Sequence, residues 1–236
     1  MQSPTSGEAA QGTTADTSAH EAEVRNAIAQ GDNVQQTVRD LTVKTLSTQK
    51  HDLQSLGRLM TSVMEGVRAG AQQRLEHTAA PRHAVLTSIS DAIAGLDSAL
   101  AKLAEASKLA LEEAAGRAQK FSDEDLTRVR SELESVESLF LETVRASAAA
   151  AQTAVSEVLH DFVAHAKRNG TAVGTQMKDT LTVFNNQMTS TGQTRLEAGM
   201  QLTHAITDLM RQVAAGILTG IAERVKPDDK SKTTIV

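Results

Sequence analysis

A seven-residue repeat of apolar residues constrains this chain more than any other feature of its sequence. Between residues 86 and 114 the apolar or small residues alternate in steps of three and four, and residues 126–140 repeat the pattern. This spacing places a narrow apolar stripe along one side of a helix, where a partner helix can cover it. The main residues of the two stripes are Ile89, Ile93, Leu96, Leu100, Leu103, Leu126, Val129, Leu133, Val136 and Phe140. The chain is therefore predicted to be all-α, with long amphipathic helices that form an antiparallel coiled coil or helical bundle.

The core of this chain has to be built almost without aromatic side chains. The sequence has no Trp or Tyr, only 4 Phe and 3 Pro among its 236 residues, yet 40% of the residues are hydrophobic. Aromatic rings carry much of the buried area in ordinary globular cores, so Leu, Ile, Val, Met and Ala must do so here. Such a core suits closely spaced helices better than the thick core of an enzyme.

Charge and cysteine content exclude several functional classes. The net charge is -5 and no sustained basic stripe is present, so nucleic acid is not expected as a partner. The absence of Cys excludes disulfides, Cys-based zinc sites and thiol catalysis, and it fits a cytoplasmic location. We find no secretory signal and no apolar run of the ~18 residues that a spanning helix needs, so no transmembrane segment is expected.

The sequence divides into five segments by composition and turn signals. They are a disordered tail (1–17), short amphipathic helices (18–80), a long helical hairpin (81–169), C-terminal amphipathic helices (170–226) and a second disordered tail (227–236). Both tails have too little apolar surface to offset the entropy of ordering. Ser18 and Glu21 have the spacing of a capping box, and Asp32 in the next turn signal can cap the helix that follows.

The hairpin is predicted to consist of helices 82–119 and 123–168. Ser122 can cap the second helix, and the three acidic residues after it suit the positive end of the helix dipole. Asn169 and Gly170 can end this helix in a left-handed turn, and no Pro or Gly interrupts it. One helix of about 45 residues, on the order of 65–70 Å long, is therefore expected.

The short turn between the two helices predicts their register. It should bring Leu103 close to Val136 if both helices pair within one chain. A two-helix rod leaves broad sides uncovered, and a core poor in aromatic rings needs several neighbours to bury enough area. We therefore expect a homo-oligomer, a tetramer or a larger assembly.

The segment 180–194 differs from ordinary surface helices because it contains no charged residue. Leu181, Phe184 and Met188 form a candidate surface or partner face within it. One interpretation is a weak, Thr-rich helix or a break near Thr191 and Gly192. The other is a face that another chain covers or that lies against a surface.

Candidate catalytic chemistry is sparse. Glu157 and His160 have the spacing found in di-iron carboxylate bundles, but there the motif occurs on two helices, with further glutamates in the core. Here it occurs once, so we interpret both residues as solvated helix positions. The sequence has neither a nucleophile elbow nor a phosphate-binding glycine loop. We expect no catalytic residue, cofactor or metal, and we predict that the protein is not an enzyme.

Four stretches resemble a family of uncharacterised bacterial all-helical proteins. They are LALEEAAGRAQKFSDEDL (109–126), ESLFLETV (137–144), HAKRNGTAVGTQM (165–177) and AAGILTGIAERV (214–225). The resemblance covers roughly residues 35–225 and implies no assigned activity or catalytic residue. In general build the chain also resembles phasins, the amphipathic helical proteins that coat storage-polyester granules. That resemblance implies an apolar granule or lipid surface as a partner.

Two functional hypotheses follow. In the first, the protein is a non-enzymatic, phasin-like helical protein that self-associates and coats an apolar granule or lipid surface in the cytoplasm. In the second, it is a cytoplasmic coiled-coil scaffold or assembly protein. The narrow stripe at 86–114 favours the scaffold, because a helix that lies on a surface uses a wider apolar face. A self-contained bundle without a surface partner is a third interpretation.

Overall fold

The computed structural model describes residues 8–77, 80–116, 121–190 and 202–225, with the backbone alone for 8–17, 77, 190 and 217–225. The helices are α1 (Glu8–Gln30), α2 (Val34–Leu46), α3 (Leu53–His77), α4 (Arg82–Gly116), α5 (Asp123–Ala150), α6 (Thr153–Asn169), α7 (Ala172–Ser190) and α8 (Leu202–Val225). These residues contain no strand, and the helices pack on one another. The predicted all-α helical bundle is confirmed.

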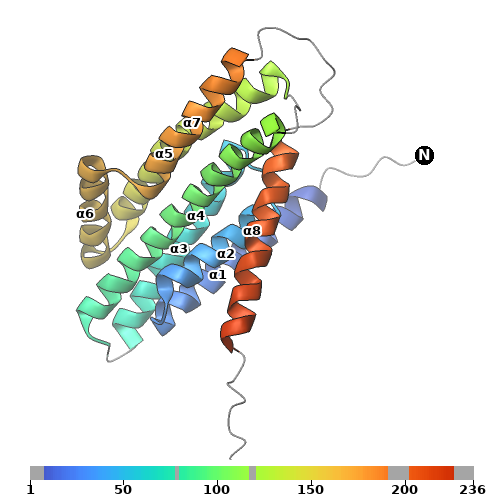
Figure 1. The fold of residues 1–236 in the computed structure, drawn as a ribbon. Helices are drawn as coiled ribbons and strands as arrows, with labels where there is room; N and C mark the ends of the chain where they lie inside the picture. Colours follow the sequence, from blue (N-terminus) through green and yellow to red (C-terminus); the bar gives the residue numbers. More distant parts are fainter. Residues whose placement is uncertain (1–7, 78–79, 117–120, 191–201, 226–236) are drawn as a thin grey trace, which may run out of the picture.

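Helix α4 is the central element of the bundle (Figure 1). Its most extensive contacts are with α2 on one side and α7 on the other. Small residues permit this crowding, because a Cβ atom added at Gly95 would collide with the backbone of α2 at Gln35. By length and composition α4 could cross a membrane, but 56% of its most apolar window is buried in the bundle. A helix covered on several sides is expected to be apolar nearly all round.

Helices α4 and α5 run antiparallel, but they do not form the predicted two-helix coiled coil. Direct contacts between them are few, because α3 on one side and α7 on the other bridge the two helices. Their ten stripe residues are nevertheless all buried, with exposed fractions of 5% or less. The stripes therefore face a common core with several neighbours. Leu103 and Val136 line the same cavity in that core, as the register from the short turn predicts.

The prediction of one continuous helix over residues 123–168 is wrong, because the helix is interrupted at residues 151 and 152. The chain leaves helical geometry at Ala151 and Gln152, which both have extended backbone angles, and α6 starts at Thr153. Figure 1 shows α6 crossing the end of the bundle, where Phe162 packs edge-on against Phe140 with ring centroids 5.9 Å apart. The Ala-rich segment before the break has few side chains that could hold a continuous rod in place. Packing of α6 on the bundle therefore decides the direction of the chain.

Two helix ends match the sequence analysis closely. Ser122 accepts a hydrogen bond from the Asp125 amide at 3.1 Å at the start of α5. Gly170, with φ of 80°, ends α6 and donates its amide to the Ala166 carbonyl at 2.7 Å.

The N-terminal part of the chain departs from two predictions. Helix α1 begins at Glu8, inside the segment 1–17 that was expected to be disordered, so Ser18 is a helix-interior residue and not a cap. At the start of α2 the cap residue is Asn33, which lies in the left-handed region with φ of 49° and makes no side-chain capping bond. The predicted capping role of Asp32 is therefore wrong.

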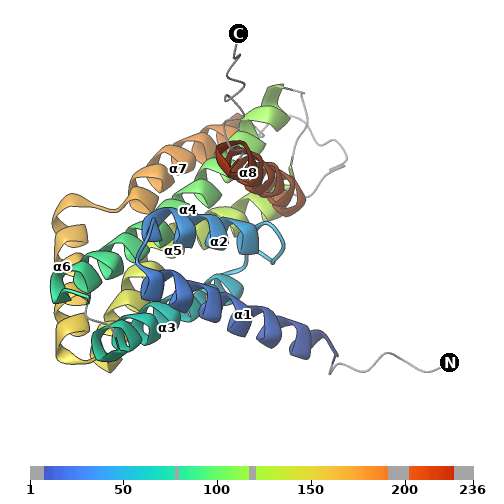
Figure 2. The same ribbon diagram turned by 90° about the horizontal axis from the view of Figure 1, so that it is seen from below.

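Helix α1 packs against α3 in the most extensive pairing of the bundle (Figure 2). Two glycines one turn apart on α3 permit the close approach. A Cβ atom added at Gly66 would lie 2.6 Å from the Glu21 carbonyl oxygen, and one at Gly70 would lie 2.6 Å from that of Arg25. The expected weakening of α3 by these glycines is thus offset by the contact they allow.

The predicted segments 18–80, 81–169 and 170–226 contribute to one core. A continuous cluster of buried side chains runs from Val24 on α1 to Ala214 on α8. The hairpin and the segments on either side of it are therefore parts of a single packed unit. The expected break near Thr191 and the tail 227–236 lie outside the described residues.

Candidate functional site

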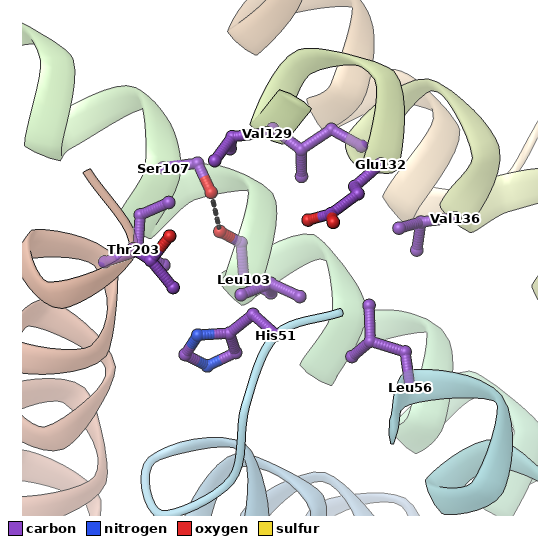
Figure 3. Close-up of a pocket in the computed structure, with 10 residues that line it drawn as sticks. His51, Leu56, Leu103, Ser107, Val129, Glu132, Val136 and Thr203 are labelled. Atoms are coloured by element: carbon purple, nitrogen blue, oxygen red, sulfur yellow. Dashed lines mark hydrogen bonds between the residues drawn. The ribbon is translucent and has the colours of Figure 1, made fainter. Parts of the chain in front are cut away.

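A small cavity lies where the loop between α2 and α3 meets α4, α5 and α8 (Figure 3). The space that the centre of a water molecule can occupy in it is about 20 Å³. Its lining combines apolar stripe residues with a histidine, a glutamate and two hydroxyl groups. The lining residues are His51, Leu56, Leu103, Ser107, Val129, Glu132, Leu133, Val136, Thr203 and Ile206. At this cavity, polar side chains from distant parts of the sequence converge in the described core.

His51 is held in a defined tautomer by the end of α2. Its Nε2 atom lies 2.7 Å from the Leu46 carbonyl oxygen. A carbonyl only accepts hydrogen bonds, so Nε2 carries the proton and Nδ1 is an acceptor. Burial lowers the pKa of His51, although the bond to Leu46 and the nearby Asp52 carboxylate act in the opposite direction. The ring is therefore neutral at pH 7.

Glu132 faces the cavity from α5, on the side opposite His51 (Figure 3). Desolvation raises the pKa of this carboxyl group, and Asp52 and Asp125 raise it further, whereas the Arg128 guanidinium lowers it. Ser107 does not contribute its proton to the cavity, because its hydroxyl donates to the Leu103 carbonyl at 2.9 Å. The few polar groups that line the cavity are thus mainly hydrogen-bond acceptors.

Helix α8 closes the cavity and is fixed there by polar contacts in its first two turns. The backbone amide of Leu202 donates to the Asp125 carboxylate at 2.6 Å. Arg128, which also pairs with Asp125, lies 3.4 Å from the Thr203 hydroxyl. The Thr207 hydroxyl lies 3.4 Å from Nδ1 of His51 but donates to the Thr203 carbonyl at 2.8 Å. Because α8 has no acidic residue of its own in the first turn, Asp125 supplies the cap from another helix.

A carboxylate from another helix also caps the start of α7. The two oxygens of Asp97, on α4, accept the amides of Ala172 and Val173 at 2.8 and 2.9 Å. Thr171 accepts the third amide, from Gly174, at 2.9 Å, and its own hydroxyl donates to Glu137 at 2.6 Å. Burial raises the pKa of Asp97, the two amide bonds lower it and Glu137 raises it. Three otherwise unpaired amides of α7 are therefore satisfied by residues outside the helix.

A second buried histidine lies between α1 and α2. His20 is 4% exposed, and its Nδ1 atom is 3.2 Å from the Thr45 hydroxyl. Within the described residues its Nε2 atom has no hydrogen-bond partner, and neither has the hydroxyl of Thr42. Burial lowers the pKa of His20 to about 4, so this ring is neutral at pH 7.

The size of the cavity limits the chemistry it can support. Substrate pockets typically have volumes of roughly 300–1,000 Å³, whereas this cavity of about 20 Å³ has room for a water molecule. Larger depressions are present, among them one of about 520 Å³ beside Glu157 and His160, but they are shallow features of the outer surface. Among the described side chains, no group of three or more His, Asp or Glu could hold a metal ion.

Sequence comparison places the chain in a family. The model of the family of unknown function DUF6781 matches residues 10–227. The chain belongs to this family. No curated protein and no solved structure matches the chain. The expected membership of a family without an assigned activity is confirmed, and the match extends further toward the N-terminus than the resemblance over 35–225.

The residues predicted to form a surface or partner face take different positions in this DUF6781 protein. Phe184 is fully buried and belongs to the core. Met188 is half-buried against the core, where its sulfur lies 3.9 Å from the Arg130 guanidinium. Leu181 is half-buried. The three residues therefore do not form one outward face of the bundle, because the uncharged segment turns part of its apolar stripe inward.

Among the described residues of this DUF6781 protein, Glu157 and His160 are not part of a group that could bind a metal ion. Glu157 and His160 are both exposed on α6, and His160 Nδ1 lies 2.8 Å from the carbonyl of Ser156 in the preceding turn. Asp161 and His165, considered as a weak surface pair, are likewise exposed, and the contacts of His165 within 3.1 Å are with the Asn169 amide.

Sequence reasoning missed the polar residues of the cavity. His51 lies in a loop and follows no periodic pattern, so nothing local predicts its burial. Glu132 is adjacent to the stripe residue Leu133, a position that sequence alone treats as solvated. Asp125 was recognised as an acidic residue in the first turn of its own helix. Its bond to α8, 77 positions further along the chain, has no local signal.

Proposed function

We propose that this protein is a non-enzymatic, self-associating helical assembly protein, and that α8 is the element through which it associates. One observation carries the proposal. Helix α8 is the most apolar of the eight helices by average hydrophobicity, yet it lies at the edge of the bundle (Figure 1). The central helix α4 is apolar because its neighbours cover it, and α8 has no comparable set of neighbours.

The bundle covers the apolar face of α8 only in part. Leu202, Ile206, Met210 and Ala214 are buried at 7% exposure or less. A second row beside them, with Ala205, Leu209 and Val213, is only half-buried. Half-buried apolar rows on an edge helix are typical of contact surfaces. They support association through α8 over an isolated monomer.

The described surface elsewhere offers little for association. Among the described side chains, Leu109 is the single large hydrophobic residue that is well exposed to solvent, with 42% exposure. A folded bundle of this kind cannot coat an apolar surface with its outer faces as they stand. The assembly interpretation is therefore favoured over a coat formed by the closed bundle. The homo-oligomeric state and the cytoplasmic location remain predictions.

The phasin-like coat is the second candidate, and the width of the α8 face favours it. A helix that lies on an apolar surface uses such a wide face. From Leu202 to Val225 the sequence contains Asp208, Glu223, Arg211 and Arg224, so its two acids and two bases cancel. That balance fits an uncharged granule or lipid droplet better than an anionic membrane.

Light scattering and droplet flotation of the purified full-length chain separate the two candidates. An assembly protein should give a particle larger than 25.0 kDa whose mass rises with concentration, and it should not float with triolein or polyester droplets at any salt concentration. Flotation of the wild type would instead support the coat. A monomer across the whole concentration range that also ignores droplets would refute both.

A variant tests the role of α8. Replacing Leu209 and Val213 with Ser should weaken association about a hundredfold or more, because each apolar side chain removed from a contact costs roughly 1.5 kcal/mol or more and the two together cost roughly 3 kcal/mol. The matched control replaces Leu141 and Val183, two half-buried apolar residues on α5 and α7. Equal effects of the two double variants would exclude α8 as the associating element.

A further inference from the structure

The antiparallel register of α4 and α5 brings two polar residues together at the cavity. Leu103 on α4 and Val136 on α5 both line it, and the two helices run in opposite directions (Figure 1). Ser107 lies one turn after Leu103, and Glu132 lies one turn before Val136. Both residues also line the cavity. Ser107 and Glu132 therefore lie at the same level of the two helices, on opposite sides of the cavity.

The cavity is open where the apolar stripes of α4 and α5 become polar. Ser107 occupies the stripe position that follows Leu103, and its hydroxyl group fills less volume than a Leu side chain. Glu132 lies three residues after Val129 and four before Val136, so it shares their face of α5. Figure 3 shows the Ser107 hydroxyl and the Glu132 carboxylate pointing into the space between the two helices. The void thus has an oxygen atom on each side.

Neither of these two oxygen-bearing groups brings a proton into the cavity. No donor of the described residues lies within hydrogen-bonding distance of the Glu132 carboxylate. The Arg128 guanidinium acts on it through its charge, whereas the hydrogen bonds of Arg128 go to other side chains. The Ser107 hydroxyl gives its single proton to the Leu103 carbonyl at 2.9 Å, so its oxygen can only accept a further bond. Two acceptors therefore face one void without a donor between them.

A water molecule matches this arrangement in size and in chemistry. A cavity holds a water once roughly 10–15 Å³ are open to its centre, and about 20 Å³ are open here. Its two protons suit two acceptors, and its oxygen can accept the proton of the Thr203 hydroxyl, which is also in the wall. A buried water typically makes about three such bonds. A carboxylate oxygen that is taken out of solvent without a donor is costly, which favours the hydrated state.

We propose that the cavity is a binding site for one ordered water molecule, which donates one proton to the Glu132 carboxylate and the other to the Ser107 hydroxyl oxygen. Nδ1 of His51 has the Thr207 hydroxyl of α8 at 3.4 Å, so it is not assigned to this water. The water joins α5 to α4, two helices that have few direct contacts, at the level where their stripes are polar. The site does not depend on self-association.

Nuclear magnetic resonance of the full-length protein tests the site, because a hydrated cavity and a dry one give opposite results. In the wild type, the methyl groups of Leu103 and Val136 should show cross-relaxation with water, and xenon under pressure should not shift their signals. A dry apolar cavity binds xenon. Xenon-induced shifts at these methyl groups without a water signal would refute the proposal, and this measurement needs no variant.

The variant Glu132→Met removes the acceptor, keeps a side chain of similar length and leaves the hydroxyls of Ser107 and Thr203 in place. The water signal should disappear and xenon-induced shifts should appear. A signal as strong as in the wild type would come from the hydroxyl protons and would overturn the proposal. Glu132→Gln keeps one acceptor oxygen and should retain the water, so loss of the signal in this variant also counts against the site.

The matched control is Glu134→Met, two residues further along α5. The Glu134 side chain is 44% exposed and pairs with Arg130, so this variant should keep the water signal and should not respond to xenon. Loss of the signal in Glu134→Met as well would show that the signal does not report on the Glu132 carboxylate, and the proposal fails. Circular dichroism at 222 nm identifies a variant that does not fold, in which case the wild-type measurement decides.

Discussion

Removal of the Asp97 carboxylate should destabilise the fold and release the start of α7. Asp97 is 8% exposed and accepts two backbone amides of α7, at 2.8 and 2.9 Å. In Asp97→Ala both amides lose their partner while they remain inside the protein. The hydrogen bond between Thr171 and Glu137 is left as the polar anchor at this end of the helix.

The expected magnitude follows from those two hydrogen bonds. A hydrogen bond to a charged group contributes about 1.5–3 kcal/mol, so two would contribute about 3–6 kcal/mol. Burial of the carboxylate, which raises the pKa of Asp97, offsets part of that gain. We expect a loss of about 3 kcal/mol in the free energy of unfolding. Asp97→Asn keeps one acceptor oxygen and should lose about half as much.

Urea unfolding followed at 222 nm measures the change, and amide hydrogen exchange locates it. Protection should fall first at Ala172 and Val173. The control is Glu105→Ala, two turns further along α4, because the Glu105 side chain is 42% exposed and its recorded ion pair among the described residues is with Lys102. That variant should change stability by less than ~1 kcal/mol. If Asp97→Ala loses under ~1 kcal/mol and both amides of α7 stay protected, the capping argument is wrong.

Three further predictions test buried features of the bundle. The pKa of His20 is lowered to about 4, so its contribution to stability is fully present above the unfolded value near 6.5 and is lost as the pH falls. Between pH 7 and 5 His20 should contribute ~2 kcal/mol to the loss that urea unfolding records, and His20→Gln should remove that part while leaving the part due to His51, whose pKa is also lowered by burial. Gly66→Ala should lower the free energy of unfolding by about 2 kcal/mol, because the new Cβ atom would lie 2.6 Å from a carbonyl oxygen of α1. The control Gly216→Ala, whose Cβ atom would have no atom within 4 Å, should raise it by up to ~1 kcal/mol. Equal melting temperatures of the two variants would contradict this prediction. Phe184→Ala should lower the free energy of unfolding by about 3–5 kcal/mol, since the ring is 0% exposed. The exposed-site variant Leu109→Ser should lower it by less than ~0.5 kcal/mol. Urea denaturation of both variants would reveal or disprove this difference.

Helix positions with a local signal could be predicted from the sequence. Helix α5 begins after Ser122 and α6 ends at Gly170, where the capping chemistry places these boundaries. The stripe residues on α4 and α5 are buried as their spacing indicates. These features depend on residues within one or two turns, so the sequence contains all the information that determines them.

Partners of the helices could not be predicted in the same way. A stripe of Leu and Ile indicates that one face of a helix must be covered, but any helix of suitable shape can cover that face. The tertiary structure places α7 and α3 between α4 and α5. It also turns Phe184 inward and bends the chain at Ala151, because burying α6 on the end of the bundle outweighs the local preference for a continuous helix.

The polar site belongs entirely to the tertiary structure. His51, Glu132 and Thr203 are far apart in the chain, and each has a local sequence that predicts an ordinary loop or surface position. Asp97 and Asp125 cap helices that begin 75 and 77 residues later. By itself the sequence determined which segments are helical and which faces are apolar, since both depend on neighbours within one or two turns. Which helices meet, and which charges they bury between them, depends on long-range packing, and only the folded structure decided it.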